Sequence, residues 1–271
     1  MADPSVERRF SIGASRYEAH AHVQRLSAAD LLAFTLDAPE GLRVESILEP
    51  GCGTGLYTRM LLDAFPDASI DGVDISEAMV RLAGERVADP RARFGMADAE
   101  EIVAGRYDLI TSNATFQWFL SFDRTVRRLA SLLSDGGRLT FSFFGPGTFA
   151  ELDEALRAER AGRGEDAGER RAGGGTASAG FLSRRDIEAS LSGVFSRRDV
   201  VERVYRQDFR DLADLLKSIR YTGTGGSKSR EPWSPGRLAR VEQAYRERFG
   251  GIRATYQVFL CRGAGRKEGP S

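Results

Sequence analysis

A glycine-rich turn between a short apolar segment and an amphipathic one constrains this chain more than any other feature. Ser46 to Pro50 is mainly apolar, Gly51 to Gly55 reads Gly-Cys-Gly-Thr-Gly, and Leu56 to Phe65 places apolar residues at helical spacing. This pattern predicts a strand, a tight turn and a helix. Glycines at such a turn let the backbone approach a ligand closely, and the helix that follows presents free N–H groups.

The alternation of strand and helix continues along the chain. Further strands are predicted at residues 68–74, 93–98, 106–112 and 138–144, with one helix after the N-cap Ser76 and another at residues 123–133. Asp135 to Gly137 is interpreted as the stop of that second helix. Strands and helices in this order predict an α/β fold with a doubly wound, mostly parallel sheet and a ligand at the carboxyl ends of its strands.

After Phe144 the alternation breaks, and we interpret the rest as additions to a single domain that spans residues 1–271. Residues 145–181 are expected to form a helical insertion or lid, with a flexible loop at about 161–180, where Gly, Ala, Arg and Glu dominate. Later helices are predicted at 183–191, 212–219 and 235–249, and later strands at 196–209 and 252–260. We expect the last strand to join the edge of the sheet in antiparallel orientation.

Charge and residue usage exclude several classes of function. Thirty-nine basic residues balance thirty-nine acidic ones, which removes the long-range positive field that a general nucleic-acid binder needs. No stretch approaches the roughly 20 apolar residues that span a bilayer, so we expect a soluble, cytoplasmic protein with no membrane segment. Two cysteines and two histidines lack the number and spacing of a metal site, and no metal is expected.

Acidic residues at the ends of three predicted strands indicate which ligand the turn holds. Glu49 stands just before the first glycine, where it would repel the pyrophosphate of a dinucleotide, and the turn lacks the G-x-G-x-x-G spacing of that fingerprint. A carboxylate there suits a cationic amine, such as that of S-adenosylmethionine. Asp74, about 20 residues beyond the turn, is placed to accept both ribose hydroxyls. Asp98 is placed to accept from an adenine amino group or to cap a helix.

These residues resemble the motifs of class I S-adenosylmethionine-dependent methyltransferases. The resemblance implies S-adenosylmethionine as the cofactor. It places the cofactor contacts at the following residues: Tyr17, Gln24, Glu49, Gly51, Cys52, Gly53, Gly55, Asp74, Ile75, Met79, Asp98, Ala99 and Asn113. Cys52 is also interpreted as a small packed residue, since the loop offers no basic neighbour that would activate a thiol.

Three further segments narrow the resemblance. Ser112 to Trp118 reads Ser-Asn-Ala-x-x-Gln-Trp, Gly145 to Leu152 reads Gly-Pro-Gly-Thr-Phe-x-Glu-Leu, and Phe10 to Gln24 precedes both. In segment order, from about Phe10 to Arg262, the chain is similar to the malonyl-acyl-carrier-protein O-methyltransferases of biotin synthesis. The Gly/Arg/Glu-rich residues 161–180 and the segment 217–223 depart from the family pattern.

This resemblance implies methyl transfer from S-adenosylmethionine to the free carboxylate of a malonyl thioester, giving the methyl ester that primes pimeloyl synthesis. A carboxylate is already ionised at neutral pH, so no general base is expected. By family position, residues 1–40 form an N-terminal helical cap over the cofactor. Positioning roles in catalysis are assigned to Tyr17, Asn113, Gln117 and Trp118. Packing is the alternative for the two aromatic residues and a surface position the alternative for Gln24, and no particular arginine is identified as the one that orients the malonyl group.

Lys217 to Arg253 is a basic stretch in a chain that is neutral overall. It holds nine Lys or Arg and three Asp or Glu, a net charge of +6. Acyl carrier proteins are acidic, so this stretch is our hypothesis for the docking face of malonyl-acyl carrier protein, with a solvated basic face as the alternative. Malonyl-coenzyme A remains open as the carrier. Competing functions are a methyltransferase for a small free carboxylic acid or quinone precursor, and a cofactor-binding assembly factor without turnover.

Overall fold

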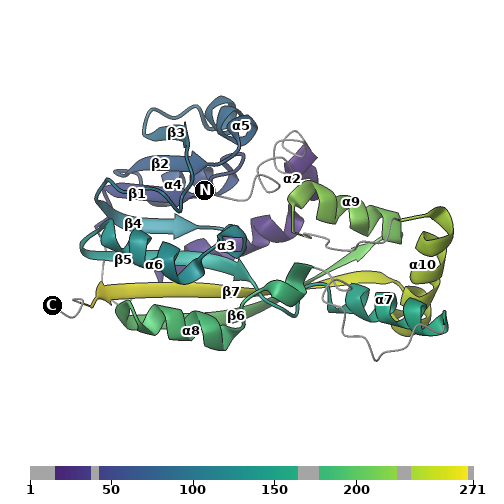
Figure 1. Ribbon diagram of the computed structural model, residues 1–271. Helices are drawn as coiled ribbons and strands as arrows, with labels where there is room; N and C mark the ends of the chain where they lie inside the picture. Colours follow the sequence, from purple (N-terminus) through teal and green to yellow (C-terminus); the bar gives the residue numbers. More distant parts are fainter. Residues whose placement is uncertain (1–15, 38–42, 164–176, 225–232, 268–271) are drawn as a thin grey trace.

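The computed structural model of the chain describes residues 16–37, 43–163, 177–224 and 233–267, which form one seven-stranded sheet with helices around it (Figure 1). The strand order is β3-β2-β1-β4-β5-β7-β6. The strands are β1 Ser46–Pro50, β2 Ser69–Asp74, β3 Ala92–Met96, β4 Tyr107–Ser112, β5 Leu133–Phe144, β6 Phe195–Phe209 and β7 Ile252–Arg266. β1 to β5 pair in parallel, and β7 is antiparallel to β5 and β6. The predicted doubly wound, mostly parallel sheet with an antiparallel last strand is confirmed.

The last strand does not lie at the edge of the sheet, so that expectation is wrong. β7 lies between β5 and β6, and its segment 258–261 is fully buried, as suits a strand that is covered on both faces. β6 forms the edge instead. It carries exposed charged side chains, including Arg197, Arg198 and Glu202, which discourage pairing with another chain.

β5 also begins earlier than the sequence predicts. α6 (Phe122–Ser131) ends before Leu133, and Asp135 to Gly137, interpreted above as a helix stop, lie inside the first part of β5. The pairing register between β4 and β5 shifts here, and Gly136 has a φ of +78°. The two glycines therefore allow an irregularity at the start of the strand.

Helices cover both faces of the sheet. α3 (His22–Leu36), α4 (Leu56–Ala64) and α5 (Glu77–Val87) lie on one face, and α6 and α8 (Arg184–Ser192) lie on the other. Two of these helices begin at serine caps: the Ser76 side chain accepts from the Met79 backbone N–H, and Ser183 forms a capping box with Asp186. The Ser76 cap predicted from the sequence is confirmed.

The remaining long helices gather at the end of the molecule drawn on the right of Figure 1, beyond the carboxyl ends of β1 and β4. These are α7 (Ala150–Gly162), α9 (Leu212–Thr222) and α10 (Pro235–Phe249), and with the four-residue α2 (Tyr17–His20) they form what we call the helical layer. α7 packs against α10, and α9 packs against both α2 and α10. The layer therefore draws on more of the chain than the expected insertion at residues 145–181. Residues 164–176, most of the loop expected at 161–180, lie outside the described residues.

The described part of the expected cap at residues 1–40 divides into two helices with different neighbours. α3 packs against α4, β5 and β7 and belongs to the main body of the fold. α2 instead contacts α9. Within the described ranges, α2 is therefore the part of this segment that joins the helical layer.

The Gly-Pro-Gly-Thr turn joins β5 to α7 through contacts with β7. The Gly147 backbone N–H donates to Gln257 Oε1 at 2.8 Å, and Thr148 Oγ1 donates to the Gln257 carbonyl at 3.1 Å. A Cβ at Gly145 would lie 2.5 Å from Gln257 Oε1 and 2.6 Å from Phe259 Cε2, so a larger residue here would displace these two side chains. This motif holds the start of α7 against the sheet.

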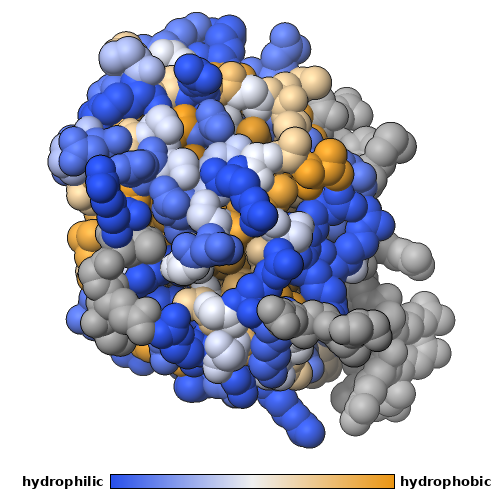
Figure 2. All heavy atoms as spheres, turned by 90° about the vertical axis from the view of Figure 1, so that its left-hand side faces the viewer, coloured by the Kyte–Doolittle hydropathy of each residue, from blue (hydrophilic) through white to orange (hydrophobic). Residues whose placement is uncertain are grey.

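The opposite end of the molecule, seen in Figure 2, carries mainly hydrophilic side chains with scattered apolar ones. Across the described ranges, no helix combines the length and the apolar character that crossing a membrane would require.

Candidate active site

The glycine turn after β1 forms the floor of the site. Gly51, Gly53 and Gly55 all have positive φ, between +55° and +79°. A Cβ at Gly51 would lie 2.2 Å from Thr115 Oγ1 in the loop after β4, whereas a Cβ at Gly53 would meet nothing within 4 Å. Gly51 therefore permits two strand ends to pack together, and Gly53 leaves open space above the loop.

Asp74 ends β2 and binds the same loop. Its Oδ2 accepts from the Gly53 backbone N–H at 3.0 Å and its Oδ1 from the Ser76 backbone N–H at 2.9 Å. Burial raises the pKa of Asp74, and these backbone donors oppose that shift. Each carboxylate oxygen still has a lone pair for a further donor, so the group is oriented to accept a pair of hydroxyls.

Glu49 is a buried carboxyl beneath the loop, with only 1% of its surface exposed. Thr58 Oγ1 on α4 donates to its Oε2 at 2.5 Å. Burial, with the Asp74 carboxylate adding to it, raises the pKa of Glu49 to about 8. A group with this pKa is largely protonated at neutral pH and becomes a carboxylate when a cation is placed beside it.

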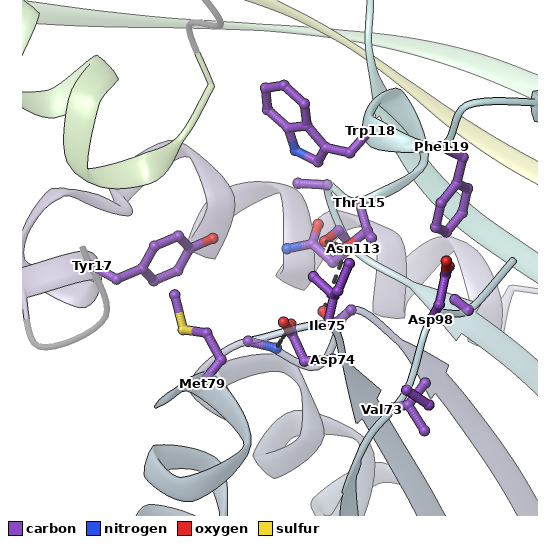
Figure 3. Close-up of a pocket in the computed structure, with 15 residues that line it drawn as sticks. Tyr17, Val73, Asp74, Ile75, Met79, Asp98, Asn113, Thr115, Trp118 and Phe119 are labelled. Carbon is purple, nitrogen blue, oxygen red and sulfur yellow. Dashed lines mark hydrogen bonds between the residues drawn. The ribbon is translucent and has the colours of Figure 1, made fainter. Parts of the chain in front are cut away.

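Two adjoining pockets lie over the glycine turn and share Tyr17, Gly51, Gly53 and Asn113, and Figure 3 shows the larger of them. The larger is lined by Tyr17, Gly51, Gly53, Val73, Asp74, Ile75, Met79, Ala97, Asp98, Ala99, Asn113, Ala114, Thr115, Trp118 and Phe119. The smaller is lined by Tyr17, Gln24, Glu49, Gly51, Cys52, Gly53, Thr54, Leu56, Tyr57 and Asn113. The ends of β1, β2, β3 and β4 therefore meet at one site, as the fold predicts.

Two of the residues proposed from the sequence lie outside the lining of both pockets. Gly55 is the N-cap of α4, and a Cβ there would lie 2.5 Å from Val87, so this glycine serves helix packing. Gln117 donates from Nε2 to the Ala114 carbonyl at 2.7 Å and stabilises the turn that carries Trp118. Gln117 lines neither pocket, and its positioning role in catalysis stays a prediction.

Gln24 and Asn113 join α3 to the site. Gln24 is buried rather than at the surface, so its surface alternative is wrong. Asn113 Nδ2 donates to the Gln24 carbonyl at 3.0 Å, while its Oδ1 accepts from the hydroxyls of Ser27 and Ser142 at 2.9 and 2.8 Å. The neighbouring Ala114 has a φ of +54° and donates its backbone N–H to Ser142 Oγ at 2.7 Å. Asn113 therefore shapes the pocket through a network of fixed partners.

Trp118 and Phe119 form the wall opposite Tyr17, as Figure 3 shows. The segment that carries them is held by Glu100, a buried residue that the sequence analysis did not select. Its carboxylate accepts from the Leu120 and Ser121 backbone N–H groups at 2.9 and 3.1 Å. An acidic residue two positions after Asp98 gives no sequence signal for this role, since its partners are 20 residues away.

Asp98 and Cys52 have local partners that refine their interpretation. Asp98 Oδ1 accepts from the Glu100 backbone N–H at 2.9 Å in a turn, and no helix follows, so the helix-cap alternative is wrong. The carboxylate also lines the larger pocket. Burial raises the pKa of the Cys52 thiol well above its ordinary value, which keeps it protonated and unreactive.

The donors and acceptors of the site fit a ligand that combines an amine with paired hydroxyls. A buried acid faces the smaller pocket at Glu49, an oriented carboxylate faces the larger one at Asp74, and Gly53 leaves the space between them open. Buried carboxylates are poor partners for a pyrophosphate. Adenosine linked to an amino acid, as in S-adenosylmethionine, meets these requirements.

Solved structures share this fold. The YcgJ protein of Bacillus subtilis superimposes with a TM-score of 0.58 at 17% identity, covering 89% of this chain and all of that chain. Phosphoethanolamine N-methyltransferase 2 of Haemonchus contortus, solved with S-adenosyl-L-methionine, gives a TM-score of 0.55 at 17% identity, covering 94% of this chain and 57% of that chain. At these identities the likeness concerns the fold alone.

Sequence comparison identifies the family. Residues 47–137 match a family model described as a methyltransferase domain. The malonyl-[acyl-carrier protein] O-methyltransferase of Halalkalibacterium halodurans is 34% identical, covering 95% of this chain and 97% of its own length. The protein of that name from Paenibacillus sp. is 33% identical, covering 94% and 96%. The chain therefore belongs to the malonyl-[acyl-carrier protein] O-methyltransferases, and its cofactor is S-adenosylmethionine.

Proposed function

We propose that this chain methylates the free carboxylate of malonyl-acyl carrier protein at the site described above. The observation that carries the proposal is the position of the Asn113 to Trp118 segment, which resembles the family and lines the larger pocket beside the glycine turn. In the reaction a carboxylate oxygen bonds to the methyl carbon while the carbon–sulfur bond breaks, and its electron pair stays on sulfur. The products are the malonyl methyl ester and S-adenosylhomocysteine.

Three acidic residues, Glu49, Asp74 and Asp98, would hold the cofactor, which supplies an electrophilic methyl group on a sulfonium. Glu49 would face the amino group, which favours the ionised form of this carboxyl and offsets the cost of its burial. Asp74 would accept the ribose hydroxyls, and Asp98, at the other end of the larger pocket, the adenine amino group. These three contacts would orient the cofactor along the strand ends.

The remaining residues of the pocket would position the acceptor. A malonyl carboxylate carries its charge at neutral pH, so the reaction needs orientation and exclusion of water rather than proton removal. Asn113, held by Ser27, Ser142 and the Gln24 carbonyl, is a rigid element of this wall. Trp118 and Tyr17 would enclose the reacting atoms from opposite sides.

The docking face for the carrier needs revision, because ion pairs neutralise much of the basic stretch 217–253. Arg237 is buried, with 3% of its surface exposed, and is therefore unsuited to a docking contact. The other arginines of this stretch in α10 and β7 have acidic partners within 3.0 Å: Arg240 with Glu159, Arg246 with Glu242, Arg248 with Glu154 and Arg253 with Asp208.

Lys217 and Arg220 on α9 are exposed, and α9 contacts α2, whose Tyr17 lines the pocket. We therefore propose α9 as the docking element for the acidic carrier.

Mass spectrometry of malonyl-acyl carrier protein after incubation with enzyme and S-adenosylmethionine tests the function. A gain of one methyl group on the malonyl form and none on an acetyl-loaded control is the expected result. Malonyl-coenzyme A, assayed in parallel, distinguishes the two carriers. Normal cofactor binding with no methyl gain on either thioester would overturn the proposal. The remaining alternatives would then be a free carboxylic acid or quinone precursor as the acceptor, or a role without turnover.

The cytoplasmic location of the protein stays a prediction.

A further inference from the structure

α2 connects the cofactor site to the helical layer. It has only four residues, none of which is buried, so it lacks the hydrogen bonds and the packing that hold a longer helix in place. Tyr17, its first residue, lines both pockets, and Figure 3 shows its hydroxyl pointing toward Asn113. The position of Tyr17 must therefore depend on side-chain contacts made by its neighbours.

On the cofactor side these contacts converge on Glu18. Its Oε1 accepts from Thr54 Oγ1 of the glycine turn at 2.8 Å and from Arg86 Nη1 of α5 at 2.8 Å, and Arg59 Nη2 of α4 lies 3.6 Å away. Burial alone would raise the pKa of Glu18, but the Thr54 hydroxyl and the two guanidinium groups together lower it. One carboxylate thus ties α2 to three separate elements around the glycine turn.

On the other side, the contacts of α2 converge on Tyr221 of α9. Arg16 Nη1 donates to the Tyr221 hydroxyl at 2.7 Å, and the His20 ring stacks on the Tyr221 ring at a centroid distance of 4.9 Å. These contacts hold α2 against the helical layer, but they do not fix its distance from the glycine turn. The contacts of Glu18 fix that distance.

We propose that Glu18 is a positioning residue, which anchors α2 over the glycine turn so that Tyr17 closes the cofactor pocket. Glu18 lies outside the lining of both pockets, so it acts through Tyr17 and not by touching the cofactor. The inference rests on the proposed cofactor site and adds a residue to it. No residue of α2 is buried. Replacing Glu18 therefore removes the charge-assisted contacts that hold α2 without removing a buried side chain.

A double-mutant cycle on binding of S-adenosylhomocysteine tests this role. Calorimetry on the full chain compares wild type, Glu18→Ala, Tyr17→Ala and the double variant. We expect Glu18→Ala to bind about tenfold more weakly, as loss of a partly buried charge-assisted contact implies. Tyr17→Ala should bind at least as weakly as Glu18→Ala, and the double variant should bind no more weakly than Tyr17→Ala. Effects that multiply in the double variant, or Glu18→Ala binding within twofold of wild type, would overturn the proposal.

A matched control separates positioning from loss of charge. Glu85 on α5 forms an exposed ion pair with Arg81 at 2.6 Å, one residue before Arg86, so Glu85→Ala removes an equal charge near the site. This control should bind as wild type does. Without ligand, hydrogen exchange at residues 17–20 should be faster in Glu18→Ala, while its melting temperature stays within about 1 °C of wild type, as for a surface change. Unchanged exchange would contradict the inference.

None of these binding measurements uses a methyl acceptor, so the two proposals fail separately. Wild-type binding of S-adenosylhomocysteine without methylation of malonyl-acyl carrier protein would overturn the proposed function alone. Methylation by wild type together with unaltered binding by Glu18→Ala would overturn the positioning role alone.

Discussion

The carboxyl ends of β1 to β4, which we call the cofactor end of the sheet, and the helical layer beyond them are held in shape by different kinds of contact. At the cofactor end, buried and half-buried carboxyls bond to groups close in sequence or on adjoining strand ends, as Asp74 does with Gly53 and Ser76. In the layer, exposed arginines pair with acids from distant segments, as Arg248 does with Glu154. Hydrogen-bonded groups away from solvent fix the positions of their neighbours, whereas exposed ion pairs contribute little to stability. Cofactor binding and substrate binding should therefore be separable by mutation.

The largest effect is expected from Asp74→Asn. Both oxygens of Asp74 accept backbone N–H groups, so an asparagine must turn its NH2 toward one of these donors. Loss of charge and the disturbed turn together should weaken S-adenosylmethionine binding about 100-fold or more, measured by calorimetry.

Asp71→Asn is the control for this variant, since Asp71 lies on the same strand and accepts from the Tyr107 hydroxyl at 3.1 Å, outside the pockets. It should bind the cofactor as wild type does. Equal losses in the two variants would show that the site does not depend on the oriented carboxylate of Asp74.

Glu49 should make cofactor binding depend on pH. With a pKa of about 8 in the free protein, its carboxyl is mostly protonated at pH 7, whereas an ammonium partner requires the carboxylate. Binding should therefore release a proton, and affinity should rise about fivefold between pH 7 and pH 8. Calorimetry in buffers of different ionisation enthalpy measures the proton release directly.

Glu49→Gln supplies the comparison for this pH dependence. It should bind the cofactor about tenfold more weakly at pH 8 and show no proton release. Proton release that persists in Glu49→Gln would assign the titration to another group and contradict the role of Glu49.

A change on β7 that loosens the attachment of the helical layer should affect the acceptor and spare the cofactor. Gln257→Ala removes the partner of the Gly147 backbone N–H and loosens the start of α7, which should cost about 1–2 kcal/mol of unfolding free energy. The KM for malonyl-acyl carrier protein should rise while the Kd for S-adenosylhomocysteine stays within twofold. Gln243→Ala, which removes an exposed contact with Glu247 on α10, is the control. A parallel loss of cofactor affinity would break the distinction between the two regions.

The smallest effect is expected on α9. Charge reversal at Lys217 and Arg220 should raise the KM for the carrier-bound substrate about fivefold at low salt and leave a small malonyl thioester unaffected. Arg81→Glu, a single charge reversal on α5, should leave both KM values unchanged. If the α9 variant impairs both substrates equally, α9 is not a docking element.

The residues at the cofactor end of the sheet were easier to predict from the sequence, because they lie at or just after the ends of strands. Glu49, Asp74 and Asp98 each stand at the end of a strand that hydrophobic patterning identifies, and parallel strands bring these ends together. Gln117 and Gly55 show the limit of this reasoning: both belong to motifs next to the site, yet neither lines a pocket. Gln117 instead donates to the Ala114 carbonyl, and Gly55 packs against Val87.

The helical layer was less predictable, since it depends on contacts between distant segments. Nothing in the run from Lys217 to Arg253 shows that Arg240 and Arg248 meet acids on α7 or that Arg237 is buried. The position of β7 inside the sheet follows from burial of its apolar segment on both faces, which strand length and alternation do not reveal. Glu18 and Glu100 escaped selection for the same reason, because their partners are 20 or more residues away.

A crystal structure of the chain with S-adenosylhomocysteine tests the central assignment most directly. We expect the amino group to lie against Glu49 and the Asp74 carboxylate to accept both ribose hydroxyls, with Tyr17 covering the ligand. A ligand whose ribose contacts neither oxygen of Asp74, or whose amino group lies away from Glu49, would contradict this assignment.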